Sequence, residues 1–236
     1  MTSAERREQL IGVARELFSE NTFEGTSVEE IAERAEVSKP VIYEHFGGKE
    51  GLYAVVVDRE MRALESAIRT ALTVPGQSFR ETLERGAMAM MDYIEANPDG
   101  FRIISRDSSL TATSATYASI LNDITTEVTE ILTKSLEERG YNPMLGPIYA
   151  QGMVGMVAMA AQQWLDNRSL PKEELVAQVV NLLWNGLRNL QKEPKLVTQL
   201  AEPPAKRRRD ADVQDEAEDD AEQPTKRRRR RAEANS

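Results

Sequence analysis

The sequence predicts an all-α protein, and three observations support that prediction. Apolar residues recur at the three- and four-residue spacing of a helix from residue 4 to about residue 190. No segment alternates apolar and polar residues as a half-buried strand does. After residue 193, proline and runs of like charge replace the apolar residues. We therefore expect a helical protein that ends in a disordered tail.

The first expected helix covers residues 4–21, and residues 22–26 connect it to the next. Phe23, within that connection, is expected to fill part of the core. The apolar stripe of the helix consists of Leu10, Ile11, Ala14, Leu17 and Phe18. This stripe should pack against the two short helices that follow.

Residues 27–46 have the pattern of a helix-turn-helix. Ser27 and Glu30 form a capping box, which predicts a helix start. Glu36 and Val37 make the turn, and Ser38 is the expected N-cap of a second helix, with Pro40 in its first turn. The outward side chains of this second helix are a cation, aromatic rings and small apolar groups, which suit a DNA major groove. They are Lys39, Pro40, Val41, Tyr43 and His45.

Six further helical segments are expected, at residues 49–72, 78–96, 101–106, 115–139, 148–166 and 170–190. The first of these should connect two domains. The last two are apolar on more than one face, so they need cover on two sides. A second copy of the same pair would cover them as an isologous four-helix dimer interface. The residues predicted for that interface are Met159, Trp164, Val180, Trp184 and Leu187.

The composition argues against several classes of protein. The 236 residues include no cysteine, and His45 is the only histidine, so thiolate chemistry and a histidine-based metal site or catalytic triad are not expected. We expect neither enzymatic activity nor a cofactor. The N-terminus has no apolar signal core, and we count no window with the roughly 18 apolar residues of a membrane span. These features predict a cytoplasmic protein without membrane contact.

The charge restricts how DNA could be bound. The net charge is −9, and the first sixty residues hold about seven basic and thirteen acidic side chains. Because phosphate contacts favour basic proteins, affinity must come from a small local basic surface. Arg6, Arg7, Lys39 and Lys49 are the candidates for that surface.

The N-terminal sixty residues resemble the TetR family of bacterial transcription regulators. The resemblance rests on the stripe of residues 10–18, the capped segment 26–32 and the run Val37-Ser38-Lys39-Pro40-Val41-Ile42-Tyr43-Glu44-His45-Phe46 followed by Lys49-Glu50. The family usually has glycine where this chain has Thr22 and Glu36. Both positions are in turns where a positive φ is common, and we expect Asn21 to take that conformation in place of Thr22.

The resemblance implies roles for the residues of this surface. Tyr43 and Lys49 would hold phosphates, with Thr26 and Ser27 near the DNA backbone. Lys39, Val41 and His45 would face base edges. The full predicted DNA-binding set is Thr26, Ser27, Ser38, Lys39, Pro40, Val41, Tyr43, His45 and Lys49.

A ligand pocket is predicted in the C-terminal helices. Four methionines are flexible enough to line a cavity for an apolar or acyl ligand, although plain core packing is the alternative. They are Met90, Met91, Met153 and Met156. Arg102 and Arg106 would form the polar end of the pocket, and the alternative for them is a surface ion pair.

These expectations combine into three segments and one function. Residues 4–64 form the DNA-binding domain, residues 65–193 form the ligand-binding and dimerisation domain, and residues 194–236 form the tail. The tail carries eleven basic and ten acidic residues, which suit DNA attraction, contact with each other or plain solvation. We expect a homodimeric repressor that a small ligand, of unknown identity, releases from a palindromic operator in double-stranded DNA. The alternatives are an activator of the same family and a helical ligand-binding or adaptor protein that no longer binds DNA.

Overall fold

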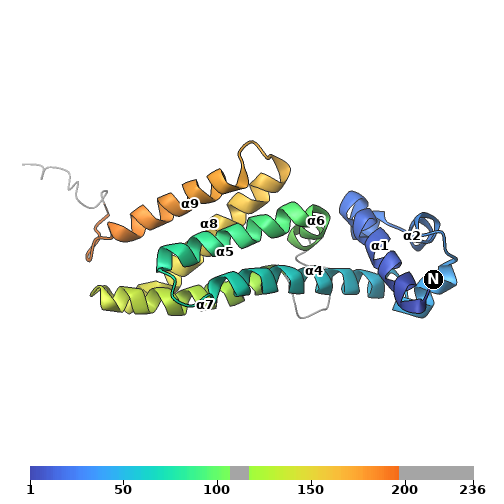
Figure 1. Cartoon of the computed structure of the whole chain (residues 1–236), viewed down its shortest axis with the longest axis horizontal. Coiled ribbons are helices and arrows are strands. Elements are labelled where there is room, and N and C mark those ends of the chain that lie inside the picture. The colour runs from blue at the N-terminus through green and yellow to red at the C-terminus, as the bar shows by residue number, and fades with distance from the viewer. Residues whose placement is uncertain (107–116, 197–236) are drawn as a thin grey trace, which may run out of the picture. The chain divides into compact units, whose positions relative to one another are not determined.

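The computed structural model describes residues 1–106 and 117–196. Within those ranges every regular element is a helix, which confirms the predicted fold class. Residues Met1–Lys192 form one compact unit (Figure 1). Its elements are α1 (Ser3–Gly25), α2 (Val28–Arg34), α3 (Lys39–Phe46), α4 (Lys49–Leu72), α5 (Phe79–Ala96), α6 (Pro98–Arg106), α7 (Tyr117–Glu138), the 3-10 turn η1 (Pro143–Leu145), α8 (Gly146–Asp166) and α9 (Lys172–Arg188). Residues 107–116, which include the first two residues of the helix expected at 115–139, and the tail from residue 197 onward lie outside the described residues.

Helices α1 and α3 pack against α4, α2 packs against α1 and α3, and together with the first half of α4 they form what we call the head. Leu10 and Leu17 of α1, Ile31 of α2, Ile42 of α3 and Leu52 of α4 are all fully buried there. They come from the stripes that the sequence predicted. Burial of these side chains stabilises the two short helices α2 and α3, which would be unstable alone.

The caps of the head follow the sequence, with one exception. The Ser27 hydroxyl accepts from the Glu30 N–H at 3.1 Å, and the Glu30 carboxylate accepts from the Ser27 N–H at 3.3 Å, as predicted. Ser38 is the N-cap of α3, but its side chain makes no capping hydrogen bond. Pro40 has no N–H to donate, and the Val41 N–H bonds to the Ser38 carbonyl instead.

Two turns of the head have backbone angles that glycine adopts more easily. Thr22 has φ 67° and Glu36 has φ 54°. The expectation that Asn21 would take this conformation is therefore wrong: α1 continues through Asn21 and bends at Thr22 before ending at Gly25. The Thr26 hydroxyl donates to the Thr22 carbonyl at 2.8 Å, and this bond supports the bend.

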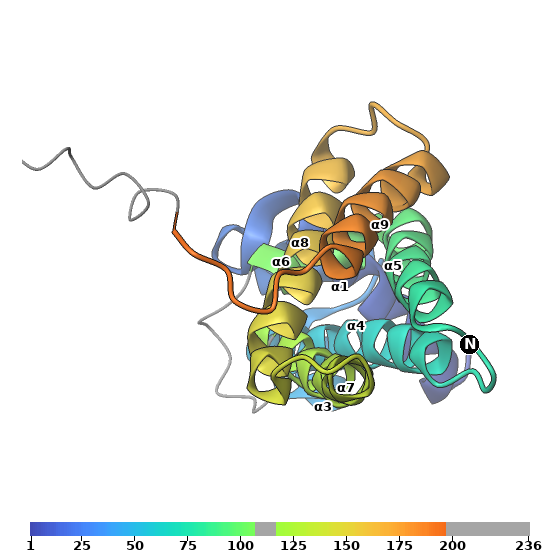
Figure 2. The same ribbon diagram turned by 90° about the vertical axis from the view of Figure 1, so that its left-hand side faces the viewer.

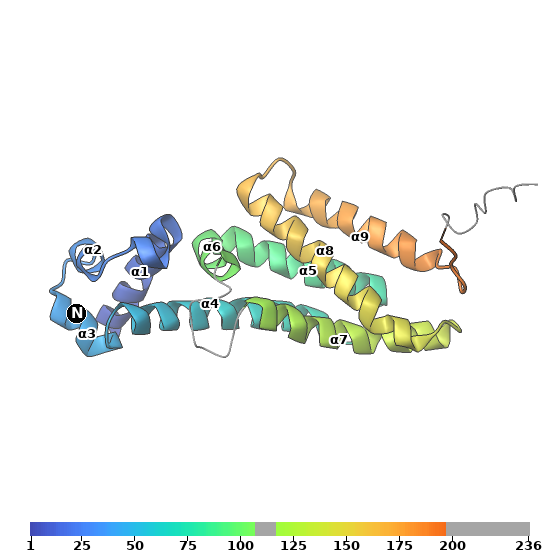
Figure 3. The same cartoon turned by 180° about the vertical axis from the view of Figure 1, so that it is seen from behind.

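The second half of α4 belongs to a group of long helices that we call the body. Helix α4 packs against α5 and α7, α7 packs against α8, and α5 packs against α9. Figure 2 shows these helices nearly end on, and Figure 3 shows α4 and α7 running side by side. Short α6 lies against α1 and α4 and so joins head and body.

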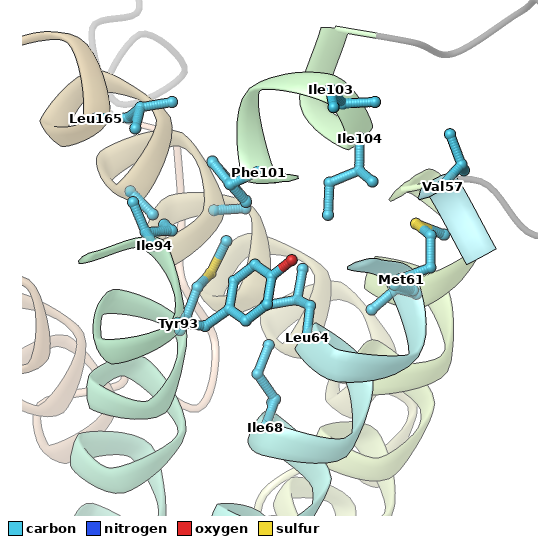
Figure 4. Close-up of a cluster of buried hydrophobic side chains, with 14 of the residues drawn as sticks. Val57, Met61, Leu64, Ile68, Tyr93, Ile94, Phe101, Ile103, Ile104 and Leu165 are labelled. Atoms are coloured by element: carbon cyan, nitrogen blue, oxygen red, sulfur yellow. The ribbon is translucent and has the colours of Figure 1, made fainter. Parts of the chain in front are cut away.

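The core at this junction is apolar (Figure 4). Met61 and Leu64 of α4, Ile94 of α5, Phe101 of α6 and Leu165 of α8 are all buried within it. Because α4 runs unbroken from the head into this core, a displacement of the body helices can reach the head through α4 and α6.

Glu36→Gly should stabilise the protein, because glycine adopts the positive φ of this turn without the steric strain of a side chain. We expect the free energy of unfolding in urea to rise by about 0.5–1 kcal/mol. Glu33→Gly is the matched control, since Glu33 is exposed within α2. It should lower stability by about 1 kcal/mol. A loss of stability in both variants would contradict the role assigned to the turn.

Candidate DNA-binding surface and effector cavity

Helix α3 presents a short polar and aromatic face. Lys39, Pro40 and Tyr43 are exposed, while Val41 and His45 are half-buried. Tyr43 exposes 56% of its surface, and its ring lies over Gly48, where an added Cβ would sit 3.4 Å from the ring carbon Cε1. This contact lies along one edge of the ring, at Cδ1 and Cε1, and more than half of the residue stays exposed. The exposed Ser38, without a capping bond, lies at the start of the same helix.

Lys39 does not have a free charge. Its ammonium forms an ion pair with the Glu29 carboxylate of α2. The hydrogen bond from Lys39 holds the pKa of the Glu29 carboxyl below its usual value. Any partner of Lys39 must therefore compete with Glu29.

Two residues of the predicted DNA-binding set have structural contacts instead. Thr26 is buried, and its hydroxyl donates to the carbonyl oxygens of Leu17 and Thr22. The Lys49 ammonium donates to the carbonyls of Phe23 and Thr26, both at 2.9 Å, and lies 4.2 Å from the centroid of the Phe23 ring. These groups hold the end of α1 against α4. We correct the assignment of Thr26, whose buried side chain is closed to DNA, while the phosphate contact of the half-buried Lys49 stays a prediction. Nothing in the sequence pattern indicated these long-range bonds.

The other cations of the head are also engaged. Arg59 forms two hydrogen bonds with the Glu8 carboxylate, at 2.6 and 2.8 Å, and Arg34 lies 3.6 Å from Glu20. The Arg7 guanidinium stacks 4.5 Å from the centroid of the Phe46 ring of α3. Local pairing thus engages the cations of the head and leaves its acidic excess uncompensated, and α3 adds the hydroxyl groups of Ser38 and Tyr43 to the exposed surface.

A buried carboxylate joins the head to the body. Glu60 of α4 is 4% exposed, accepts a 2.7 Å hydrogen bond from the Tyr93 hydroxyl of α5 and lies 3.5 Å from the Arg15 guanidinium of α1. Burial, and then the bond to Glu60, raise the pKa of Tyr93 well above its usual value. Gly100 of α6 covers this group so closely that a Cβ would lie 2.0 Å from a Glu60 oxygen. Helices α1, α4, α5 and α6 therefore meet at the Glu60 carboxylate.

A second polar contact joins α1 to α6. The Ser19 hydroxyl donates to the Asp99 carboxylate at 3.0 Å, and Arg106 donates to the Ser19 carbonyl at 3.2 Å. Arg102 lies 3.3 Å from Asp99. The prediction that Arg102 and Arg106 form the polar end of the ligand pocket is therefore corrected: Arg106 bonds to α1, and both arginines line a separate polar hollow between α6 and α8 instead of the apolar cavity.

The body contains one elongated apolar cavity between α4, α5, α7, α8 and α9. Its volume is about 50 Å³, or about 530 Å³ when the open solvent at its mouth is included, and every side chain lining it is apolar. Met90 and Met153 line it, as predicted from the sequence. Met91 is buried in the core and does not line this cavity, and Met156 is exposed on the outside of α8. Periodicity identified apolar faces but could not say which one bordered empty space.

The exposed apolar surface lies on α8 and α9. Ile148, Met156 and Met159 follow one another at helical spacing along α8, and Leu182 projects from α9, exposed by 64%. A Cβ on Gly152 would meet no atom within 4 Å, so this stripe is open to a partner. Exposed apolar side chains that lie next to one another in this way are typical of a surface that binds another protein chain.

Most residues predicted for the dimer interface lie elsewhere. Trp164 is buried with its indole N–H bonded to the Leu170 carbonyl at 2.8 Å, and Val180 and Leu187 are buried inside the protomer. Trp184 is half-buried, with its ring centroid 6.5 Å from that of Phe79. We correct the assignments of Trp164, Val180 and Leu187 because their own chain covers them, while that of the half-buried Trp184 stays a prediction. Met159, exposed by 66%, remains on the open surface.

Helix α8 has one further property that the sequence analysis missed. The segment Pro143–Asp166 is long and apolar enough to cross a membrane, with a mean hydropathy of 1.3. In the structure it packs lengthwise against α7. Length and composition alone are weak evidence for a membrane span, since core helices pass the same test. In the described part of the chain, no cluster of three or more acidic, histidine or cysteine side chains could hold a metal ion.

Comparison with known proteins gives matches along most of the chain. A family model described as bacterial regulatory proteins, tetR family, matches residues 10–56, and one described as tetracyclin repressor-like, C-terminal domain, matches residues 67–198. The HTH-type transcriptional activator FasR of Mycolicibacterium smegmatis is 32% identical over 186 residues, which cover 78% of this chain and 83% of that protein.

Solved structures share the fold. A TetR-like transcriptional regulator from Rhodococcus sp. RHA1 aligns with a TM-score of 0.63 at 23% identity, covering 80% of this chain and 100% of the other. The fatty acid degradation regulator FadR from Bacillus halodurans aligns with a TM-score of 0.62 at 20% identity, covering 78% and 96% of the two chains.

Tyr93→Phe should destabilise the protein, because the buried Glu60 carboxylate loses its closest donor. We expect a loss of about 1.5–3 kcal/mol in the free energy of unfolding, measured in urea. Tyr117→Phe is the matched control, since the Tyr117 hydroxyl is also buried but has no hydrogen-bond partner among the described residues. That variant should be neutral or more stable. Equal effects in both would show that the Tyr93 bond contributes nothing specific.

Proposed function

Because the chain belongs to the TetR family of bacterial regulatory proteins and is a DNA-binding transcriptional regulator, we propose that it works as a ligand-controlled dimer on a palindromic operator. TetR-family regulators bind DNA and act as dimers, and they are not enzymes. The observation that carries the proposal is the exposed face of α3, held rigidly at the far end of α4 from the effector cavity.

The DNA contacts follow from exposure. Tyr43 and Ser38 offer hydroxyl groups to phosphates, with Ser27 at the start of α2 as a third donor. Lys39, Pro40 and Val41 face the base edges, with His45 at the rim of that surface. Lysine pairs well with guanine and valine with the thymine methyl group. The head would therefore bind DNA through a few neutral hydrogen-bond donors and through Lys39. Lys39 would break its ion pair with Glu29 and form a hydrogen bond with a base instead.

A second copy would cover the stripe of Ile148, Met156 and Met159. In an isologous contact the same stripe lies on both partners, so one apolar surface covers the other. Leu182 of α9 would extend that contact. The dimer would present its two α3 helices about 34–36 Å apart, or a multiple of this, to successive major grooves.

The effector is proposed to be apolar, because every side chain lining the cavity is apolar. The relative named for fatty acid degradation is compatible with such a ligand. A ligand that widens the cavity pushes on α5, which continues into α6. Helix α6 contacts the head at Glu60 and Ser19, so the spacing of the two α3 helices changes with ligand binding.

A regulator that its ligand releases from the operator would act as a repressor in the absence of the ligand. Activation is the second candidate, favoured by the relative that is named as an activator. A reporter gene driven by the upstream promoter, with and without the regulator, distinguishes the two. We propose a cytoplasmic location for either mode, because the DNA is there.

Tyr43→Phe should weaken binding to all duplexes by about 3- to 10-fold, because one phosphate hydrogen bond is lost. Lys39→Met should alter the preference among operator variants, because it removes a base contact. Gel shifts at two salt concentrations on the region upstream of the gene, and on a random duplex, measure both effects. Arg62→Gln, an exposed charge further along α4, is the control. Failure of the unmodified dimer to retard any duplex would favour a ligand-binding protein without DNA contact.

Met159→Glu should convert the dimer to a monomer, since it buries two like charges in the apolar stripe. Sedimentation velocity at micromolar protein measures the change. Val74→Glu introduces the same charge at an exposed apolar position of the α4–α5 turn and should leave the dimer intact. An unchanged sedimentation coefficient for Met159→Glu would place the interface on another surface.

A further inference from the structure

A second hollow lies one helical turn beyond the apolar cavity. On α5 the lining passes from Leu83 in the cavity to Phe79 in the hollow, and on α7 it passes from Val128 to Leu132. Each step is four residues, which is one turn along the same face. Cavity and hollow are therefore consecutive parts of one seam between helices.

Helix α9 makes the same step. Val180 lines the cavity, and Trp184 lines the hollow four residues later. The hollow opens where α7 and α9 end, the end of the body opposite the head (Figure 1, left). Measured along α7 from Leu121 in the cavity to Leu132 in the hollow, the seam is roughly 16 Å long.

The hollow differs from the cavity in charge. Arg139 and Arg188 line it together with the aromatic rings of Phe79 and Trp184. Among the described residues, neither arginine has an ion pair with a carboxylate, whereas Arg62, Arg69, Arg80 and Lys172 of the body do. The rim of the seam therefore has uncompensated positive charge next to apolar surface.

Arg139 is held in place at this rim. One of its guanidinium nitrogens donates to the carbonyls of Leu187 at 3.0 Å and Arg188 at 3.5 Å, and its charge lies 5.0 Å from the centroid of the Tyr141 ring. Two N–H groups at most are used in these bonds, so at least three remain for another acceptor. A fixed guanidinium with free donors is suited to a carboxylate or phosphate.

We propose that the effector is amphipathic, with a long alkyl chain in the apolar cavity and an anionic head group on Arg139 and Arg188. The inference rests on the proposed function, because it identifies the chemical class of the molecule that the cavity binds. The head group is a carboxylate or a phosphate, since both offer the oxygen acceptors that a guanidinium binds. The chain runs toward α6, and the charged end stays at the rim of the body.

The orientation also keeps the site separate from the proposed dimer surface. Trp184 and Leu182 are two residues apart on α9, so they project from nearly opposite sides of the helix. Leu182 lies on the open surface, while Trp184 faces α5. Both protomers of a dimer can therefore bind a head group at once.

Binding of three 16-carbon probes to the full chain tests the proposal. Palmitate, hexadecyl phosphate and hexadecanol, each below its aggregation concentration, are titrated by calorimetry. We expect the two anions to bind at least about tenfold more tightly than the neutral alcohol. Preference for palmitate or for hexadecyl phosphate then identifies the head group. Equal affinities for all three would overturn the assignment of an anionic head.

Substitutions then locate the head group. Arg188→Gln should weaken binding of the anions by about tenfold and leave hexadecanol unchanged. Arg139→Gln should do the same, but Arg188 is the safer test because no side-chain hydrogen bond of Arg188 holds the fold in the described structure. Arg168→Gln removes a matched arginine, stacked on Trp164 between α8 and α9, and should change nothing. An unaltered preference for anions in Arg188→Gln and Arg139→Gln would place the head elsewhere.

A third variant separates this inference from the function on which it rests. Val157→Phe narrows the cavity without touching the arginines and should abolish binding of all three probes, with folding checked by circular dichroism. If no probe binds the unmodified protein, the apolar effector itself is wrong. If hexadecanol binds as tightly as the two anions and Val157→Phe abolishes binding of all three probes, the apolar cavity is the binding site and only the proposed anionic head group is wrong.

Discussion

The orientation of the head depends on one buried charge. An ionised carboxylate removed from water is strongly destabilising unless hydrogen bonds and opposite charge compensate it. Glu60 obtains that compensation from α1 and α5, and α6 can approach it only because residue 100 is glycine. Any movement that separates these helices leaves the carboxylate without partners. Separating the head from α4 and α6 is therefore unfavourable, and a two-state regulator needs such coupling between its parts.

The body divides its surfaces between two tasks. The inner faces of its helices enclose an apolar seam, while the outer face of α8 exposes a stripe of large apolar side chains. A surface of this kind is unfavourable in water, so it favours association. An apolar ligand inside and a second protomer outside would both act on α8, which links effector binding to the geometry of the dimer.

Sequence periodicity and caps predicted the helices well, because both depend on residues near one another in the chain. The Ser27 and Glu30 capping box is an example. Contacts between distant residues were not predictable. Lys49 reaches carbonyls more than twenty residues earlier, and Ser19 reaches Asp99 eighty residues later. Trp164 and Val180 were assigned to the dimer surface because an apolar pattern shows that a side chain is buried, without showing which chain covers it.

The ion pair between Lys39 and Glu29 affects how the protein would search a chromosome. On a random sequence, Lys39 would exchange one anion, its own glutamate, for another, a phosphate, and the net gain would be small. A guanine edge would offer two acceptors in fixed geometry and a better exchange. Encounters with unrelated DNA would then be short-lived, so that few molecules would be sequestered on the wrong sites despite their vast excess.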